Sequence, residues 1–208
     1  MTTKTKPTDA TTDQIERRYL AEPRIELREA EGQRPRVRGY AAVFGRKSEP
    51  MWRFVEVIEA GAFDDVLGDD VRALFNHDGL PLARTKSGTL QIGVDQTGLW
   101  YDFETPDSTG GNDLVVAIRR GDVDQSSFSF TVSKEQWDRR DENDAKSVDV
   151  RHIMKVKRLY DVSPVTFPAY PDTSVAVRSL ERARAADASL SRSRRARELE
   201  LAEAANRT

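Results

Sequence analysis

Residues 127–133, with the sequence SFSFTVS, alternate between hydroxyl-bearing and apolar side chains. A period of two places successive side chains on opposite faces of a β-strand, so this segment predicts a half-buried strand with one face in a hydrophobic core. Ser127 stands at the start of the hydroxyl-bearing face, on a rigid element that would hold it in place. A serine hydroxyl without a neighbouring base is a weak nucleophile, and most such serines do no chemistry. The rest of the chain has to supply that base before Ser127 becomes a catalytic candidate.

The remaining apolar patterns predict a domain made mostly of short strands. Small helices inserted between such strands favour an α+β or barrel-like domain over a doubly wound parallel sheet. Residues 61–67 have helical spacing, and a second helix is expected from an N-cap at Asn112 to a stop at Gly121. Two of the predicted strands, 90–94 and 99–103, would form a hairpin. The strands are expected at residues 24–29, 37–44, 52–58, 71–75, 90–94, 99–103, 127–133 and 162–168.

Three segments are expected to lie outside the folded core. Residues 1–22 are rich in Thr, Asp and Lys and predict a disordered N-terminal tail. Residues 134–149 are almost wholly polar and predict an exposed hairpin tip or loop. Residues 178–208 are rich in Arg, Ala and Glu and predict a solvated helix or a disordered C-terminal tail, with a scaffold-docking helix as the functional alternative. A single domain over residues 23–177 is the resulting prediction, and the length of 208 residues favours one domain over two.

The composition excludes several classes of protein and site. The formal net charge of −2 argues against a nucleic-acid-binding protein with a broad basic surface. The chain contains no cysteine, which rules out disulfides, zinc–thiolate sites, iron–sulfur clusters and cysteine nucleophiles. Only two histidines are present, so we expect no metal site. No apolar run approaches the length of a membrane span and the N-terminus has no secretory signal, so we expect a soluble protein made in a cytoplasm.

Two histidines are available as the base for a catalytic serine. His77 follows an apolar strand and precedes a turn, where its ring can face a cleft, although a half-exposed surface histidine is the plainer interpretation. His152 lies among lysines and arginines in the sequence, a neighbourhood that deprives an imidazole of an anionic partner. His77 is therefore the better candidate. Asp161, directly before the 162–168 strand, is a candidate for the group that orients the base, but an exposed strand-end carboxylate fits its position equally well.

Five short motifs follow one another along the chain. They are RGYAAVFG at residues 38–45, EAGAF at 59–63, LFNHD at 74–78, SSFSF at 126–130 and DVSPVTFPAYPDT at 161–173. Together they resemble the prohead proteases of tailed bacteriophages, the HK97-type capsid-maturation serine peptidases. Each motif alone is a weak signal, whereas five in the right order and spacing are a strong one. The resemblance covers residues 25–178, nearly all of the segment expected to fold.

The resemblance implies both a fold and a set of catalytic residues. The fold would be like that of the herpesvirus assembly proteases, a strongly bent, mostly antiparallel β-barrel with a few flanking helices. His77 would be the base and Ser127 the nucleophile. Asp161 would stand where the herpesvirus enzymes have a second histidine, and an acid there would hold the imidazole and stabilise the imidazolium.

Two further features of the site follow from the same resemblance. Ser129 occupies a position where many family members have glycine, and its hydroxyl faces the same side as that of Ser127. It would hydrogen-bond near the site, and it could be mistaken for the nucleophile. Backbone N–H groups at the turn about Ala169 and Tyr170 are expected to form the oxyanion hole.

The implied function is that of a serine endopeptidase that processes capsid and scaffold proteins, and also itself, during phage prohead maturation. It would need no cofactor and would act in the host bacterial cytoplasm, inside the assembling procapsid. Its partners would be the major capsid protein and the scaffolding segment of that protein. The herpesvirus relatives also imply a homodimer or a higher homo-oligomer, and no membrane partner is expected.

Two other functions stay open at this point. A catalytically inactive capsid-assembly or scaffolding protein could keep the same fold, although a decayed site should have lost at least one of His77, Ser127 and Asp161. A nucleic-acid-binding structural protein would depend on the basic cluster at residues 192–197. Glutamates lie close to that cluster and aromatic residues are absent from it, so we do not expect nucleic acid as a partner.

Overall fold

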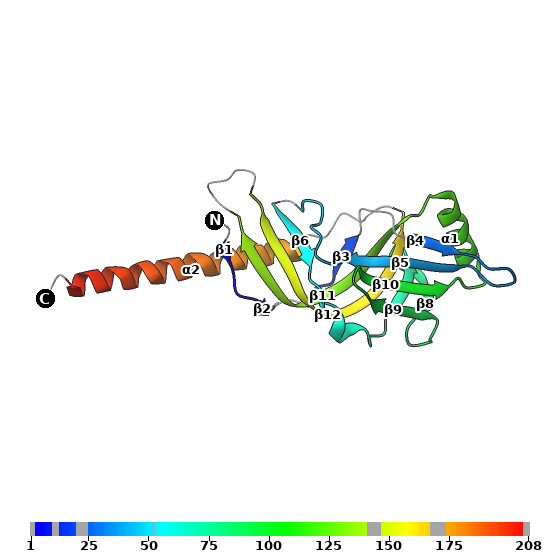
Figure 1. Cartoon of the computed structure of the whole chain (residues 1–208), viewed down its shortest axis with the longest axis horizontal. Helices are drawn as coiled ribbons and strands as arrows, with labels where there is room; N and C mark the ends of the chain where they lie inside the picture. The colour runs from blue at the N-terminus through cyan, green and yellow to red at the C-terminus, as the bar shows by residue number, and fades with distance from the viewer. Residues whose placement is uncertain are drawn as a thin grey trace. The chain divides into compact units, whose positions relative to one another are not determined.

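The structure, a computed structural model, describes residues 3–9, 13–19, 25–51, 53–140, 147–166 and 174–205. Within these ranges the chain forms two β-sheets and a small number of helices (Figure 1). It divides into two units, Met1–Thr173 and Ser174–Thr208. The first unit contains both sheets and every residue expected at the catalytic site.

The larger sheet is organised around its two longest strands. Its members are β1 (Thr3–Lys4), β2 (Thr8–Asp9), β3 (Glu16–Tyr19), β6 (Phe54–Ile58), β7 (Arg72–Phe75), β8 (Asp78–Arg84), β11 (Gln125–Arg139) and β12 (Asp149–Val165). β11 and β12 pair antiparallel along most of their length and bend across the molecule (Figure 1). β1, β2 and β3 pair antiparallel with β11. β6 and β7 pair with β12 in parallel, and β8 pairs antiparallel with β7.

The smaller sheet is a four-stranded antiparallel sheet within the described residues. Its strands are β4 (Ile25–Arg28), β5 (Arg36–Val43), β10 (Gly98–Glu104) and β9 (Leu90–Val94), in that spatial order. The predicted hairpin between β9 and β10 is confirmed. Its turn is held by the Asp95 carboxylate, which accepts hydrogen bonds from the N–H groups of Thr97 and Gly98. Gly98 is required by a close approach of β5, since a Cβ there would lie 1.9 Å from the carbonyl oxygen of Ala42.

Both sheets contribute side chains to one hydrophobic core. Phe128 and Phe130 of β11 point into it, and their rings stack with centroids 4.7 Å apart. Phe63 packs edge-on against Phe128 at 5.7 Å. Tyr101 of β10 is buried in the same core, and its hydroxyl forms a 2.7 Å hydrogen bond with Ser126 because a buried hydroxyl needs a partner. The apolar face of the 127–133 strand therefore lies in the core, as its alternation predicted.

The described residues of the first unit form two short helices, the 3₁₀ helix η1 (Asp64–Val66) and the α-helix α1 (Thr109–Arg120). The expected N-cap at Asn112 is wrong. Ser108, one turn earlier, is the N-cap, and its side chain accepts a 3.2 Å hydrogen bond from Gly111. Asn112 lies inside the helix, where its side-chain oxygen accepts from Arg34 instead. The predicted stop is confirmed, because Gly121 ends α1 in the left-handed conformation with φ of 80°.

The expectation of an exposed loop over residues 134–149 is wrong for residues 134–139. β11 continues through them, and β12 begins at Asp149. Trp137 is buried, and its ring packs edge-on against Phe54 at 5.3 Å. Glu135 is also buried and accepts a 2.7 Å hydrogen bond from Arg151 on β12. The polar sequence of residues 134–139 predicted a loop because it does not show that their charged side chains pair with opposite charges on β12.

The N-terminal segment also differs from the expected disordered tail over residues 1–22. Its described residues include β3, which pairs with β11 at the start of the 127–133 strand. Glu16 and Arg18 on β3 are 1% and 6% exposed. The sequence of this segment resembles a disordered tail because the oppositely charged partners of Glu16 and Arg18 include residues from distant parts of the chain. The domain boundaries at residues 23 and 177 stay predictions.

The described residues of the second unit, 174–205, form the helix α2 (Ser174–Ala205). It includes the basic cluster at residues 192–197, whose side chains are exposed. Taken as a whole, the fold is a mostly-β α+β structure, which confirms the predicted class at that level. Of the helices within the described residues, none is long and apolar enough to cross a membrane.

Candidate active site

The hairpin between β7 and β8 turns through only two residues, Asn76 and His77. Both have positive φ angles, 54° and 59°, as a tight hairpin turn of type I′ requires. Neither is glycine, so the turn carries backbone strain that its surroundings have to hold. Asn76 stabilises the turn through two hydrogen bonds. Its N–H donates to the Pro164 carbonyl at 3.0 Å, and its side-chain oxygen accepts from the Thr166 N–H at 2.9 Å. The turn is thereby fixed to the end of β12, and His77 is fixed with it.

β11 and β12 supply the other side chains of the site. In their antiparallel register, Ser127 lies opposite Ser163, and Ser129 lies opposite Asp161. All four side chains lie on the face of the sheet opposite to the one that carries Phe128, because side chains alternate along a strand. Ser127 and Asp161 are nevertheless buried, at 1% and 6% exposed. The strand is therefore covered on both faces, whereas its alternation predicted a half-buried one.

The His77 ring lies between Asp161 and Ser127. Its Nδ1 is 2.5 Å from Oδ1 of Asp161, and its Nε2 is 2.6 Å from Oγ of Ser127. A carboxylate at Nδ1 holds the proton of the ring on that nitrogen, which leaves Nε2 directed at the hydroxyl. The imidazole side chain is 4% exposed, so bulk water has little access to either contact. The fold brings together three residues of which the outer two in sequence are 84 positions apart.

Asp161 is in the state that this arrangement needs. Burial raises the pKa of its carboxyl group and is the largest single influence on it. The hydrogen bond and the charge of His77, together with hydrogen bonds from Ser129 and Ser163, act in the opposite direction and lower the pKa below its ordinary value of 3.8. The Ser163 hydroxyl donates to the same Oδ1 at 2.7 Å. Asp161 is therefore an anion at neutral pH, beside the ring that it would orient.

The family model for caudovirus prohead serine proteases matches residues 23–187. This chain belongs to that family. It is also 28% identical, over 145 residues, to a curated relative named as the prohead protease of Enterobacteria phage HK97. The match covers 66% of this chain and 57% of that relative, so the chain spans little more than half the length of the curated protein that it matches. No solved structure matches the chain.

Ser129, which the family resemblance singled out beside Ser127, also lies at the site. Its Oγ is 3.2 Å from Nδ1 of His77, the nitrogen that faces Asp161. Ser127 instead contacts Nε2. The two serines therefore meet opposite sides of the imidazole, a distinction that the sequence alternation alone does not make, because it places both hydroxyls on one face.

The expectation that His152 lacks an anionic partner, which was based on its cationic sequence neighbours, is wrong. Its Nδ1 lies 2.6 Å from Oε1 of Glu59, and its Nε2 lies 3.5 Å from the carboxylate of Asp138. The lysines and arginines beside it in sequence did not reveal these carboxylates, which come from other parts of the chain. Both of its ring nitrogens face carboxylates, so neither is directed at a serine hydroxyl.

Two further expectations concerned an oxyanion hole and the absence of a metal site. Ala169 and Tyr170, expected at the oxyanion hole, lie outside the described residues. Among residues that the structure does describe, no group of three or more His, Asp or Glu side chains could hold a metal ion. Ser163 is a contributor that the sequence did not single out, although the DVS spacing places its hydroxyl on the same strand face as the Asp161 carboxylate.

Proposed function

We propose that this protein is a serine endopeptidase in which Ser127 is the nucleophile, His77 the general base and Asp161 the group that orients the base. The observation that carries the proposal is the unbroken hydrogen-bonded series from Ser127 through His77 to Asp161, with contacts of 2.6 and 2.5 Å. A buried carboxylate, an imidazole and a hydroxyl in this order are the parts that acyl transfer by serine needs.

The reaction follows from the two nitrogens of the imidazole. Ser127 Oγ attacks the scissile carbonyl carbon while its proton passes to Nε2 of His77. The imidazolium that forms is stabilised by the anionic Asp161 at Nδ1. The same proton then passes to the leaving amine as the peptide C–N bond breaks, and water hydrolyses the acyl-enzyme by the reverse use of His77. Of the two ring nitrogens of His77, Ser129 contacts Nδ1, so it takes no part in proton transfer at Nε2.

Family membership supports the biological setting of this reaction. Prohead proteases act on the shells of tailed phages, so we propose that the substrates are the major capsid protein and its scaffolding segment, and that the chain also cleaves itself. The site of action would be the assembling procapsid in the host bacterial cytoplasm. A homodimer or higher homo-oligomer, and a barrel like that of the herpesvirus assembly proteases, belong to the same proposal.

The alternative of a catalytically inactive assembly or scaffolding protein is not favoured. A protein that used the fold only as a scaffold would gain nothing from a charged Asp161 buried against His77, since burying a carboxylate costs free energy unless it is paired. The same holds for two positive φ angles in a row at Asn76 and His77, each of which is strained for a residue with a side chain.

The test is co-expression of the chain with the capsid protein of the phage that encodes it. Intact mass spectrometry would follow the capsid protein beside the unchanged chain and beside the Ser127→Ala, His77→Ala and Ser129→Ala variants. The proposal predicts shortened capsid protein with the unchanged chain and with Ser129→Ala, and full-length capsid protein with the other two. Identical fragments beside all four chains would reject the catalytic assignment.

A further inference from the structure

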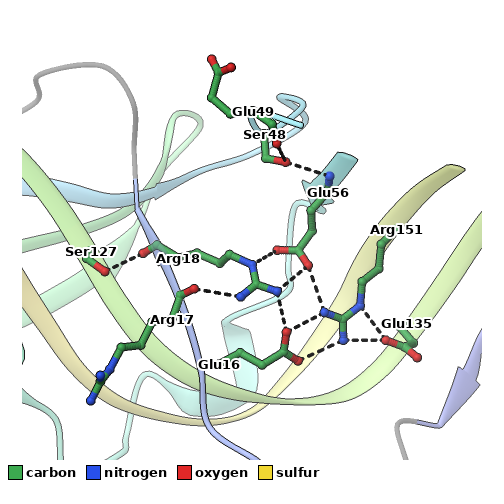
Figure 2. Close-up of polar contacts among 9 residues, drawn as sticks. All are labelled: Glu16, Arg17, Arg18, Ser48, Glu49, Glu56, Ser127, Glu135 and Arg151. Carbon is green, nitrogen blue, oxygen red and sulfur yellow. Dashed lines mark hydrogen bonds and ion pairs between the residues drawn. The ribbon is translucent and has the colours of Figure 1, made fainter. Parts of the chain in front are cut away.

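Ser127 makes a second contact that the proposed reaction does not use. Its Oγ donates a 2.9 Å hydrogen bond to the backbone carbonyl of Arg18 (Figure 2). Arg18 belongs to β3, in which Tyr19 pairs with Ser127 in the antiparallel register. A substrate has to bring its scissile carbonyl to this oxygen, and a carbonyl of the protein itself is already there.

A count of protons indicates that this arrangement is inactive. The Ser127 hydroxyl has one proton, and the Arg18 carbonyl oxygen can only accept, so Ser127 donates to Arg18. The ring proton of His77 lies on Nδ1, so Nε2 can also only accept, and the Arg18 carbonyl and Nε2 compete for the single proton of the Ser127 hydroxyl. While β3 is in place, the Ser127 hydroxyl donates its proton to the Arg18 carbonyl and not to its base.

Buried ion pairs hold β3 in this position (Figure 2). The Arg18 guanidinium donates to Glu56 at 2.6 and 3.0 Å and to Glu16 at 2.5 Å. Arg151 donates to Glu16 at 2.7 and 3.0 Å, to Glu56 at 3.0 Å and to Glu135 at 2.7 Å. Arg18 and Glu16 are the members contributed by β3, whereas Glu56, Glu135 and Arg151 belong to β6, β11 and β12.

Departure of β3 would take from Glu56 the two hydrogen bonds that it accepts from Arg18. Glu16 and Arg18 would leave together, so the formal charge of the cluster would stay the same, but of its contacts in this cluster Glu56 would keep the one of 3.0 Å with Arg151. A buried carboxylate without a cation is costly. A basic side chain that took the place of Arg18 against Glu56 would restore these contacts.

Resting on the proposed function, we propose that β3 occupies the place of the substrate. A substrate polypeptide binds as an antiparallel strand on the same edge of β11, with a lysine or arginine side chain against Glu56 and the carbonyl of that residue at Ser127. Addition of an extended peptide to a sheet edge is a general mode of peptide recognition. β3 is then an internal competitor, Glu56 is a specificity-determining residue, and cleavage follows a basic residue.

The first arm of the test measures access to Ser127 with a fluorophosphonate, a small reagent that labels activated serines and needs no strand binding. Arg18→Ala should loosen β3 and raise the labelling rate by about tenfold or more, because the rate scales with the open fraction of the protein. Glu16→Gln, which keeps the side-chain volume, should raise it as well. Arg28→Ala removes an arginine from an exposed pair with Glu26 and should leave the rate unchanged. Thermal unfolding of each variant reports whether it has kept its fold.

The second arm uses synthetic peptides that differ only at the residue before the scissile bond, with Arg, Lys, norleucine or Glu at that position. The full chain should cleave after Arg and Lys with a kcat/KM about tenfold or more above that for norleucine. Glu56→Gln should speed fluorophosphonate labelling, because β3 loosens, and at the same time reduce the preference for a basic residue. Arg18→Ala should speed labelling and keep the preference. A variant that merely disturbed the fold would not separate these two readouts.

The outcomes distinguish this inference from the function on which it rests. Equal labelling rates in the unchanged chain, Arg18→Ala and Glu16→Gln would overturn the role of β3. Cleavage with no preference for a basic residue, or an unchanged preference in Glu56→Gln, would overturn the role of Glu56 while leaving the peptidase intact. Absence of both labelling and cleavage in every folded variant would contradict the proposed function itself, and this inference with it.

Discussion

Replacement of Arg151 with methionine would test how the buried charge cluster stabilises the fold. Arg151 is 1% exposed and donates to three carboxylates, those of Glu16, Glu56 and Glu135, over distances of 2.7–3.0 Å. Methionine is long enough to fill much of the same space but carries no charge. In the Arg151→Met variant, Glu16 and Glu56 would keep their contacts with Arg18, and Glu135 would lose its 2.7 Å contact with Arg151.

The Arg151→Met substitution should lower the free energy of unfolding by a large amount, because it removes the cation and leaves its carboxylate partners buried. Breaking a buried ion pair in this way typically destabilises a protein by about 3–5 kcal/mol. A domain of this kind has only about 5–15 kcal/mol of stability in total, so the variant should lose a substantial part of it. An arginine in an exposed pair is worth about 0–1 kcal/mol by comparison.

The loss should also depend on pH in a defined direction. Burial, the largest influence, raises the pKa of Glu16, but the charges of Arg151 and Arg18 outweigh it and lower the pKa below 4.5. A lowered folded-state pKa stabilises the protein above the unfolded-state value and ceases to do so as pH falls through the folded-state value. Without Arg151 the pKa of Glu16 would rise, so the destabilisation should be greatest at neutral pH and should shrink as the pH falls to 4.5 and below.

The assay is urea unfolding followed by circular dichroism at pH 7 and again near pH 4.5. Arg28→Met is the matched control, because it makes the same substitution in a pair whose arginine and glutamate are 53% and 68% exposed. A loss in Arg151→Met no greater than that in the control, or one that stays the same at both pH values, would refute the view that these charges are buried and mutually dependent.

Three further predictions concern the site and its support. Asp161→Asn should lower the kcat for peptide cleavage by about 10⁴, with a much smaller change in KM, because an amide no longer fixes the proton on Nδ1 of His77; an unchanged kcat would contradict the role of Asp161. The lowered pKa of Asp161 should make the unchanged chain more stable relative to that variant at pH 7, with the difference declining as pH falls below 3.8, as urea unfolding would measure. Gly39→Ala should destabilise the fold by about 1–3 kcal/mol, because its Cβ would lie 2.5 Å from the Tyr101 hydroxyl oxygen. Gly68→Ala meets nothing within 4 Å and is the control in thermal unfolding, so equal melting temperatures would show that the β5–β10 contact is looser than described.

Features fixed by neighbouring residues could be predicted from the sequence. The alternation of residues 127–133 identified the core face of β11, and turn residues identified the β9–β10 hairpin. The stop of α1 followed from Gly121, which alone at that end can adopt a left-handed conformation without strain. Its start was misplaced, because Ser108 and Asn112 are both good capping residues and only their surroundings decide between them.

Features that depend on distant charges could not be predicted. The sequence of β3 resembles a disordered tail because Glu16 and Arg18 find their partners on β6 and β12, far along the chain. Residues 134–139 were expected in a loop for the same reason. His152 shows the same limit at a single residue, since its sequence neighbours are cationic while its contacts in space are carboxylates.

The candidate site combines features that could be predicted from the sequence with features that only the fold determines. His77, Ser127 and Asp161 were expected from residue type, from elimination and from a family resemblance, and the fold places their side chains in contact. The Arg18 carbonyl at Ser127 had no signal in the sequence, because every residue carries a backbone carbonyl and only the fold selects one of them. Ser163 had a weak signal in its spacing from Asp161.

The most direct test of the account is to map where a fluorophosphonate reacts, by peptide mass spectrometry, in the unchanged chain and in the His77→Ala and Ser129→Ala variants. We predict a single adduct on Ser127 in the unchanged chain, its persistence in Ser129→Ala and its loss in His77→Ala. An adduct on Ser129, or equal labelling of Ser127 with and without the imidazole, would contradict the claim that His77 activates Ser127.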